Sequence, residues 1–314
     1  MSIENEDKMN NTSKSIELDL SQIFMTVWER KSIVVVITGV FAILSVIYSL
    51  SLPNYFKSSS ILELSGGTNT ISAGSGSAYS GLAALAGINI SKVSISDKAM
   101  IAKQTILSRD FFRHIMNFDG VLEGVIATKA YNKETKDIIY DSNLFDVESG
   151  WQATDDNGNQ AVMSFLDAHK SFTSLVDIFL DFDTGLLTIS VEHKSPEFAY
   201  YLTDLIINEL NNLERNRDIA QAMRAIEFLN EQLEVNKYAD VRLSINRLIQ
   251  SQLETQMLAN VRQDYLLYQL DTPYIPEKKS RPRRSLICIF GTFFGLLLSI
   301  IYCLVDGFVI RKSR

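Results

Sequence analysis

The sequence predicts an α+β protein in which two transmembrane helices flank one α/β domain that carries a long protruding helical hairpin. Three observations lead to this prediction. Two uncharged apolar runs lie near the two ends of the 314 residues, and short β-rich segments lie between them. About 70 residues after Pro196 then contain neither proline nor glycine and repeat apolar side chains at helical spacing.

The two apolar runs are residues 33–52 and 285–305, each about 20 residues long. That length crosses a hydrocarbon core of ~30 Å as a helix. A cleavable signal peptide is the alternative for the first run, but signal sequences have a basic start and a small-residue cleavage site. Here acidic residues outnumber bases before the run and no A-x-A pattern follows it. We therefore expect an uncleaved membrane anchor.

Basic residues at the outer ends of the runs set the expected orientation. Arg30 and Lys31 precede the first run, and Arg311, Lys312 and Arg314 follow the second, so both termini are expected in the cytoplasm. Five bases before the second run argue the other way, but a loop of this length translocates largely regardless of its charge. The expected organisation is a cytoplasmic segment 1–32, helix 33–52, an external domain 53–284, helix 285–305 and a cytoplasmic tail 306–314.

Charge and cysteine content narrow the class of partner. Residues 53–284 hold 30 acidic and 23 basic side chains, a net charge of −7, which argues against nucleic acid as a partner. Cys288 and Cys303 both lie in the second apolar run, so the external domain has no disulfide. Its stability must come from packing.

The first half of the external domain predicts mixed structure. Residues 55–64 predict a strand, and the glycine-, serine- and alanine-rich stretch after it includes residues 81–90, which suggest close packing. Residues 96–118 predict one helix with Ser96 as its N-cap. Residues 131–151 are polar and irregular. Residues 155–159 (DDNGN) predict a turn from their composition. They do not predict a calcium site, because an EF-hand counted from Asp155 would lack its required glycine and glutamate.

The second half predicts a hairpin and then the long helical part, residues 195–264. A short helix at 162–172 precedes strands 176–182 and 186–191, which flank a turn containing Gly185. Ser195 fits the N-cap and Pro196 the first position of the long helix. The apolar spacing breaks at residues 236–240, so we favour a hairpin with its tip near Lys237 over one helix of ~100 Å. Residues 265–270 predict a strand that returns to the membrane.

No sequence motif indicates an enzyme. The three histidines, His114, His169 and His193, have no histidine or cysteine at metal-ligand spacing, and neither a G-x-S-x-G elbow nor a phosphate-binding loop is present. We expect no catalytic residue, no metal site and no cofactor. A hydrolase active in the external domain is still an alternative, because the spacing of scattered carboxylates does not reveal a catalytic pair.

Three stretches resemble the Wzz-type O-antigen chain-length determinants, which are polysaccharide co-polymerases of Gram-negative inner membranes. These stretches are residues 80–88 (SGLAALAGI), 191–211 (VEHKSPEFAYYLTDLIINELN) and 258–284 (LANVRQDYLLYQLDTPYIPEKKSRPRR). The resemblance implies a periplasmic domain between the two helices, a ring of identical subunits, and control over how long a polymer a Wzy-type polymerase builds. Whether the growing polysaccharide is bound directly is left open.

The resemblance also points to site residues. The family's proline-rich joint maps onto Pro273, Pro276, Ser280 and Pro282, although Arg281 stands where many members have serine directly before proline. Gly291 and Gly295 remain of a glycine-rich patch in the second apolar run, where small residues let another helix approach closely. Five bases are expected at lipid headgroup level, where each attracts anionic phosphate by ~1 kcal/mol: Lys278, Lys279, Arg281, Arg283 and Arg284.

Two functions from different systems fit these expectations. The first is an oligomeric periplasmic scaffold that regulates O-antigen length through the polymerase, with membrane lipid as a further partner. The second is the transmembrane adaptor of a capsular or exopolysaccharide export system that works with a separate tyrosine kinase. A fused kinase is excluded because the sequence has no phosphate-binding loop.

Overall fold

The computed structural model describes residues 31–64, 95–152 and 164–312. The chain divides into two compact units, which are described one at a time. The apolar unit consists of Met1–Pro53 and Arg281–Arg314, and the α/β unit of Asn54–Ser280.

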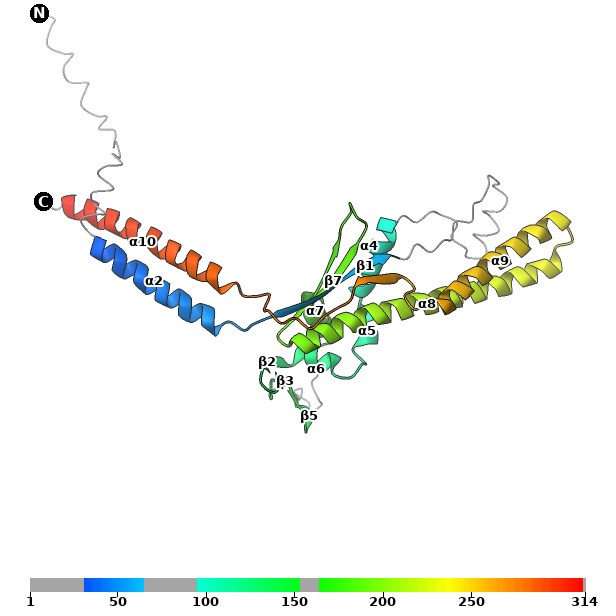
Figure 1. Cartoon of the computed structure of the whole chain (residues 1–314), viewed down its shortest axis with the longest axis horizontal. Coiled ribbons are helices and arrows are strands. Elements are labelled where there is room, and N and C mark those ends of the chain that lie inside the picture. The colour runs from blue at the N-terminus through cyan, green and yellow to red at the C-terminus, as the bar shows by residue number, and fades with distance from the viewer. Residues whose placement is uncertain (1–30, 65–94, 153–163, 313–314) are drawn as a thin grey trace, which may run out of the picture. The chain divides into compact units, whose positions relative to one another are not determined.

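The apolar unit is a pair of helices, α2 (Lys31–Ser51) and α10 (Arg284–Lys312), which pack side by side (Figure 1). Both are long and apolar enough to cross a membrane. Many of their large apolar side chains are exposed, including Val35 and Phe290, as expected for surfaces that face lipid. Helix α10 continues past the expected boundary at residue 305 and ends at Lys312, so it includes Asp306 and Gly307.

A four-stranded antiparallel sheet forms one layer of the α/β unit. Its order is β6-β7-β1-β8, with β6 Val176–Leu180, β7 Leu187–His193, β1 Phe56–Leu64 and β8 Leu267–Asp271. Burial alternates along β1, so one face of the sheet packs on the helices and the other faces outward. The predicted first strand, hairpin and returning strand are confirmed.

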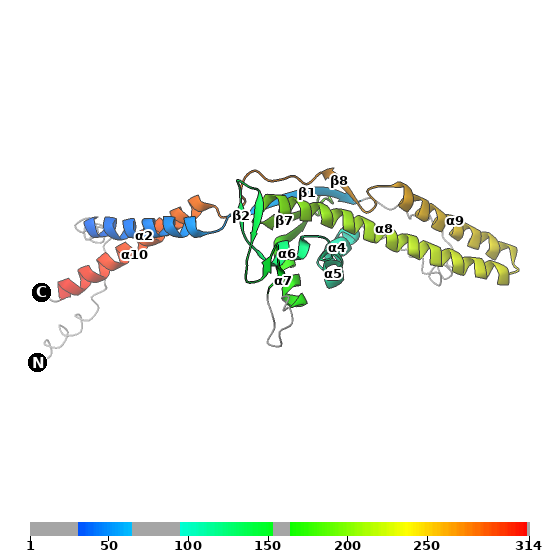
Figure 2. The ribbon, with the colours of Figure 1, turned by 90° about the horizontal axis from the view of Figure 1, so that it is seen from below.

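Helices form the second layer. They are α4 (Ile95–Ile106), α5 (Arg109–Ile115), α6 (Val121–Ile126), α7 (Phe165–Leu175) and the start of α8 (Pro196–Val235). Helix α8 lies along β1 and β7 (Figure 2). Phe112, Phe172, Leu202, Ile206 and Leu62 are among the fully buried side chains of the shared core.

The prediction of a single helix over 96–118 was wrong. Helix α4 already includes Ser96, so this residue is not its N-cap. Ser108 has an extended backbone, and its side chain accepts a hydrogen bond from the Phe111 N–H, which ends one helix and starts the next. The later short helix starts at Phe165, capped by Ser164, and runs to Leu175.

Residues 131–151 are not irregular, as the sequence suggested. They belong to two small hairpins, β2 (Thr128–Asn132) with β3 (Asp137–Tyr140), and β4 (Phe145–Asp146) with β5 (Gly150–Trp151). The turns use left-handed backbone at Lys136 and Gly150. The predictions for residues 81–90 and 155–159 lie outside the described residues.

The long helical part is a hairpin of α8 (Pro196–Val235) and α9 (Ala239–Val261), seen side by side in Figure 1. The single unbroken helix is thereby excluded. Ser195 caps α8 by accepting a hydrogen bond from the Phe198 N–H, as predicted. A separate apolar cluster holds the two helices together along the hairpin and includes Ala225, Leu229, Ile245 and Leu248.

Candidate functional site

The residues that follow β8 form a strap, residues 272–280, which runs beside the N-terminal half of β1, the part before Ile61. Ser58 and Ser60 are fully buried on β1, and their hydroxyls reach the strap and the end of β8. The Ser58 Oγ donates to the carbonyl oxygen of Tyr274 at 2.8 Å, and the Ser60 Oγ donates to that of Asp271 at 2.6 Å. Side-chain hydroxyls of one strand therefore bind the carbonyl groups of the neighbouring segment.

The prolines explain why serine side chains hold the strap. Pro273 and Pro276 are both buried, and neither has a backbone N–H to donate to a neighbouring strand. Regular pairing between β1 and β8 accordingly covers only the stretch from Ile61 to Leu64. Beyond it, the Ser60 hydroxyl donates to the carbonyl oxygen of the last β8 residue, Asp271, and the Ser58 hydroxyl to that of Tyr274 in the strap.

Ser280 fixes the other end of the strap. Its N–H donates to the carbonyl oxygen of Tyr55 at 2.8 Å. Its hydroxyl contacts the same oxygen and also the carboxylate of Glu192 on β7. Ser280 thus ties the end of the strap to β7 and to the residue before β1, at the point where the α/β unit ends.

The remaining residues of the predicted joint are placed separately. Pro282 belongs to the apolar unit, whereas the other joint residues belong to the α/β unit. Arg284 is the first residue of α10 and is half-buried. The other four predicted bases are exposed, and they are Lys278, Lys279, Arg281 and Arg283.

Gly291 and Gly295 lie where α10 meets α2. A methyl group on Gly291 would come within 2.4 Å of the Ser45 Cβ, and one on Gly295 within 2.5 Å of the Phe41 Cβ. Both distances are far below a van der Waals contact, so only glycine fits at either position with the helices in this arrangement. The Phe41 and Phe294 rings meet edge to face at 6.3 Å between centroids. The sequence named the glycines but did not name α2 as their neighbour.

The three histidines hold elements of the α/β unit together. His114 on α5 bonds through Nε2 to a carboxylate oxygen of Glu209 on α8, at 2.6 Å. His169 Nε2 lies 2.9 Å from the carbonyl oxygen of Leu107, at the break between α4 and α5. Among the described residues, no group of three histidine, cysteine or acidic side chains could hold a metal ion.

His193 is buried and satisfied on both ring nitrogens. Its Nδ1 accepts a hydrogen bond from the Ser195 N–H at 3.0 Å, and Nε2 lies 3.1 Å from the carbonyl oxygen of Gly124. This geometry fits the neutral ring with its proton on Nε2. Burial lowers the pKa of His193 to about 4. It joins β7, the start of α8 and α6.

The hairpin carries apolar side chains that the α/β unit leaves exposed. They occur on both helices, and they include Met223, Val235, Leu243, Leu253, Met257 and Val261. Exposed apolar side chains that recur along a long hairpin are typical of a surface that contacts another protein.

A protein family and a solved structure are similar to this chain. The family model described as Wzz, chain length determinant protein, matches residues 16–117. No curated protein matches the sequence. A solved structure titled "full-length bacterial polysaccharide co-polymerase" is 11% identical, with a TM-score of 0.42, and the alignment covers 93% of this chain and 99% of that chain.

The family match includes the first apolar helix, strand β1 and the quoted residues 80–88, but ends before the other two quoted stretches. Strand β1, with its buried serines, is therefore inside the matched part, and the strap it holds is outside it. The match agrees with the resemblance found in the sequence: residues 16–117 are similar to the Wzz chain length determinant family.

Proposed function

We propose that this chain regulates the length of a polysaccharide, the O-antigen of lipopolysaccharide, as an oligomeric scaffold acting on a Wzy-type polymerase. The observation that carries the proposal is the match of residues 16–117 to the chain length determinant family. In this proposal the protein performs no chemistry itself. It binds no metal or cofactor, and its partners are further copies of the chain, the polymerase and membrane lipid.

The proposed location is the bacterial inner membrane. Helices α2 and α10 cross the membrane, both termini lie in the cytoplasm, and the α/β unit lies in the periplasm. Two helices of sufficient length and hydropathy support this placement.

The orientation is tested with Tyr238→Cys, because Tyr238 is exposed at the tip of the hairpin. A membrane-impermeant maleimide should label this cysteine in cells whose outer membrane is permeabilised and whose inner membrane is intact. Labelling only after lysis would place the hairpin in the cytoplasm.

The strap has a mechanical role in this proposal. It connects the last strand of the α/β unit to the chain that enters α10. Two buried prolines and the Ser58–Tyr274 contact hold it beside β1, and Ser280 holds it to Tyr55, the residue before β1. A fixed connection of this kind would transmit the arrangement of the periplasmic domains to the membrane helices. The exposed bases beside it would lie at lipid headgroup level.

Deletion of the gene tests the function. Lipopolysaccharide from the deletion strain should lose its preferred chain length on a gel, and the wild-type gene should restore it.

Pro276→Ala with Pro282→Ala should broaden or shorten the length distribution while the protein stays in the membrane. Single changes of His114, His169 and His193 to Ala should leave polymer present. Loss of all polymer from one histidine change at normal protein level would contradict a scaffold and indicate an enzyme.

The same strains separate the adaptor function. If the chain serves a capsular or exopolysaccharide system with a separate kinase, deletion changes that polymer and leaves lipopolysaccharide lengths intact. Co-purification of a tyrosine kinase with the full-length protein would then identify the partner. An unchanged capsule with altered lipopolysaccharide supports the O-antigen scaffold.

A further inference from the structure

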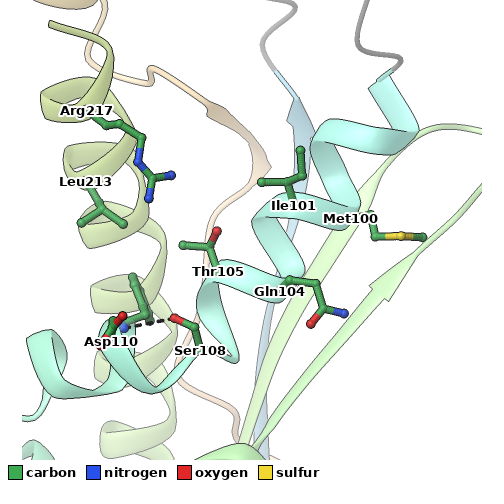
Figure 3. A pocket seen from close by; sticks show the side chains of 9 residues that line it. Met100, Ile101, Gln104, Thr105, Ser108, Asp110, Leu213 and Arg217 are labelled. Atoms are coloured by element: carbon green, nitrogen blue, oxygen red, sulfur yellow. Dashed lines mark hydrogen bonds between the residues drawn. The ribbon is translucent and has the colours of Figure 1, made fainter. Parts of the chain in front are cut away.

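A concave cavity of about 500 Å³ lies between α4, α5 and α8 (Figure 3). This volume falls within the roughly 300–1,000 Å³ that small-ligand sites occupy. Met100 and Ile101 of α4 and Leu213 of α8 are its apolar lining residues, and Figure 3 shows Ile101 on the side of α4 that faces α8. Met100 and Ile101 are each more than half exposed, so the wall is open to a ligand rather than covered by the core.

Two uncharged polar side chains of the cavity are free to bind a ligand. Figure 3 shows Gln104 and Thr105 on α4, with Thr105 on the side that faces α8. Within the described parts of the chain, neither the Gln104 amide nor the Thr105 hydroxyl is hydrogen-bonded to another group. Both groups donate and accept hydrogen bonds, which is how a ligand hydroxyl is bound.

The charged side chains at the cavity are already paired. Arg217 bonds to Glu214 at 2.8 Å on its own helix, and Asp110 bonds to Arg113 at 2.8 Å. The two opposite charges also leave the cavity without a dominant sign. An ionic ligand would have to break one of these pairs, whereas a neutral ligand with hydroxyl groups can use the free polar groups directly.

We propose that this cavity binds a segment of neutral saccharide. A pyranose ring combines apolar C–H faces with hydroxyl groups at its edge, which matches an aliphatic wall beside an amide and a hydroxyl. The proposal rests on the proposed function, because that function brings a growing polysaccharide to this protein. It adds that the chain contacts the polymer itself, at α4 and α8, in addition to any contact with the polymerase.

Binding is measured on the full-length protein in lauryldimethylamine oxide, a detergent without a sugar headgroup. Saturation-transfer NMR is run against maltotriose, cellotriose, mannotriose and galactotriose. Transfer to at least one of these is expected. Ile101→Trp fills the cavity and should abolish the transfer. Gln104→Ala removes one hydrogen-bonding group and should weaken binding up to about tenfold.

Leu166→Trp on α7 is the matched control. Leu166 is 55% exposed against 54% for Ile101, and it does not line the cavity. This variant should bind like the wild type, and circular dichroism checks that both tryptophan variants are folded. The proposal is overturned if none of the four saccharides shows transfer, or if Ile101→Trp leaves the transfer unchanged.

The outcome is separable from that of the proposed function. Chain-length profiles of the deletion strain report on the function without any binding measurement. Restored length control with no saccharide transfer would overturn the cavity proposal alone. If Ile101→Trp then altered the profile while Leu166→Trp did not, the cavity would be a protein-docking surface instead. Transfer without any effect of gene deletion on polymer length would contradict the function and leave the cavity proposal standing.

Discussion

At the scale of single residues, the strap depends on small polar side chains placed where backbone donors are missing. Ser58 and Ser60 are on the buried face of β1, and each donates to a carbonyl oxygen more than 200 residues away in sequence. The sequence predicted the strand and the prolines. The sequence could not predict the serine contacts, because no local pattern around a serine indicates which distant residue its hydroxyl will contact.

Removing these hydroxyls should destabilise the protein. Ser60→Ala leaves the Asp271 carbonyl oxygen without its donor, and we expect a loss of about 1–3 kcal/mol in the free energy of unfolding. Thermal unfolding of the full chain in detergent, followed by circular dichroism, measures the loss. Ser59→Ala is the matched control, since Ser59 is half-buried on the opposite face and should change stability by less than about 0.5 kcal/mol. Equal effects of the two variants would show that the hydroxyl contact is unimportant.

His193 predicts how stability depends on pH. Its pKa is about 4 in the folded protein and 6.5 when unperturbed, so the unfolded chain binds more protons between these values. The free energy of unfolding is therefore highest above pH 6.5, where His193 is neutral in both the folded and the unfolded chain. It falls by ~3 kcal/mol in total as the pH drops towards 4. His193→Gln should be less stable at neutral pH but should lose less stability over this pH range. Parallel pH profiles for the two proteins would contradict this account.

At the scale of elements, periodicity predicted the long hairpin because α8 and α9 each keep apolar spacing and lose it together at the tip. The break at Ser108 was missed because apolar spacing continues through it, and only the serine followed by Asp110 hints at a new N-cap. The β2–β5 hairpins were missed because their strands have two to five residues, too few for alternation to be visible.

The contact between α2 and α10 was also only half predictable. Glycines at positions 291 and 295 indicate a close approach, but sequence does not state which helix approaches. The structure places Ser45 and Phe41 of α2 there. Which face of α2 meets α10 depends on how the two helices are rotated, and this rotation is fixed by packing rather than by composition.

Adding a methyl group at the contact should separate α2 from α10. Gly291→Ala and Gly295→Ala each require a shift of the helices, and we expect a destabilisation of about 1–3 kcal/mol. The readouts are the temperature of aggregation in detergent and the amount of protein in the membrane. Gly39→Ala is the control on α2, because a Cβ at Gly39 meets nothing within 4 Å. If all three variants behave like wild type, the close contact between the helices does not exist.

At the scale of the whole molecule, the chain leaves an apolar surface that one copy does not cover. The exposed aliphatic side chains of α9 repeat along its length, and Leu253 and Met257 are four residues apart on one face. Identical chains are the partner that the resemblance implies. The number of subunits depends on the angle between neighbouring copies, which no feature of a single sequence determines.

Charge on this face should reduce assembly. We expect Leu253→Glu with Met257→Glu to lower the particle mass of the detergent-purified protein, because carboxylates would be buried between neighbouring copies. Light scattering measures the mass. Leu166→Glu on α7 serves as the control and should leave the mass unchanged. A monomeric wild-type protein, or an unchanged mass in the double variant, would exclude self-association through this face.

The strap has one more consequence, which concerns aggregation. An open sheet edge offers unpaired N–H and C=O groups to the strand of any neighbouring chain, and crowded identical subunits are at particular risk. The strap covers the edge of β1 along its N-terminal half, where β8 does not pair with it. The prolines of the strap have no N–H to donate to a further strand. At the opposite edge of the sheet, the Lys103 ammonium donates to the carbonyl oxygen of Ile178 on β6 at 2.8 Å. The strap beside β1 and the Lys103 contact on β6 therefore each remove backbone groups that a strand of another copy would otherwise pair with.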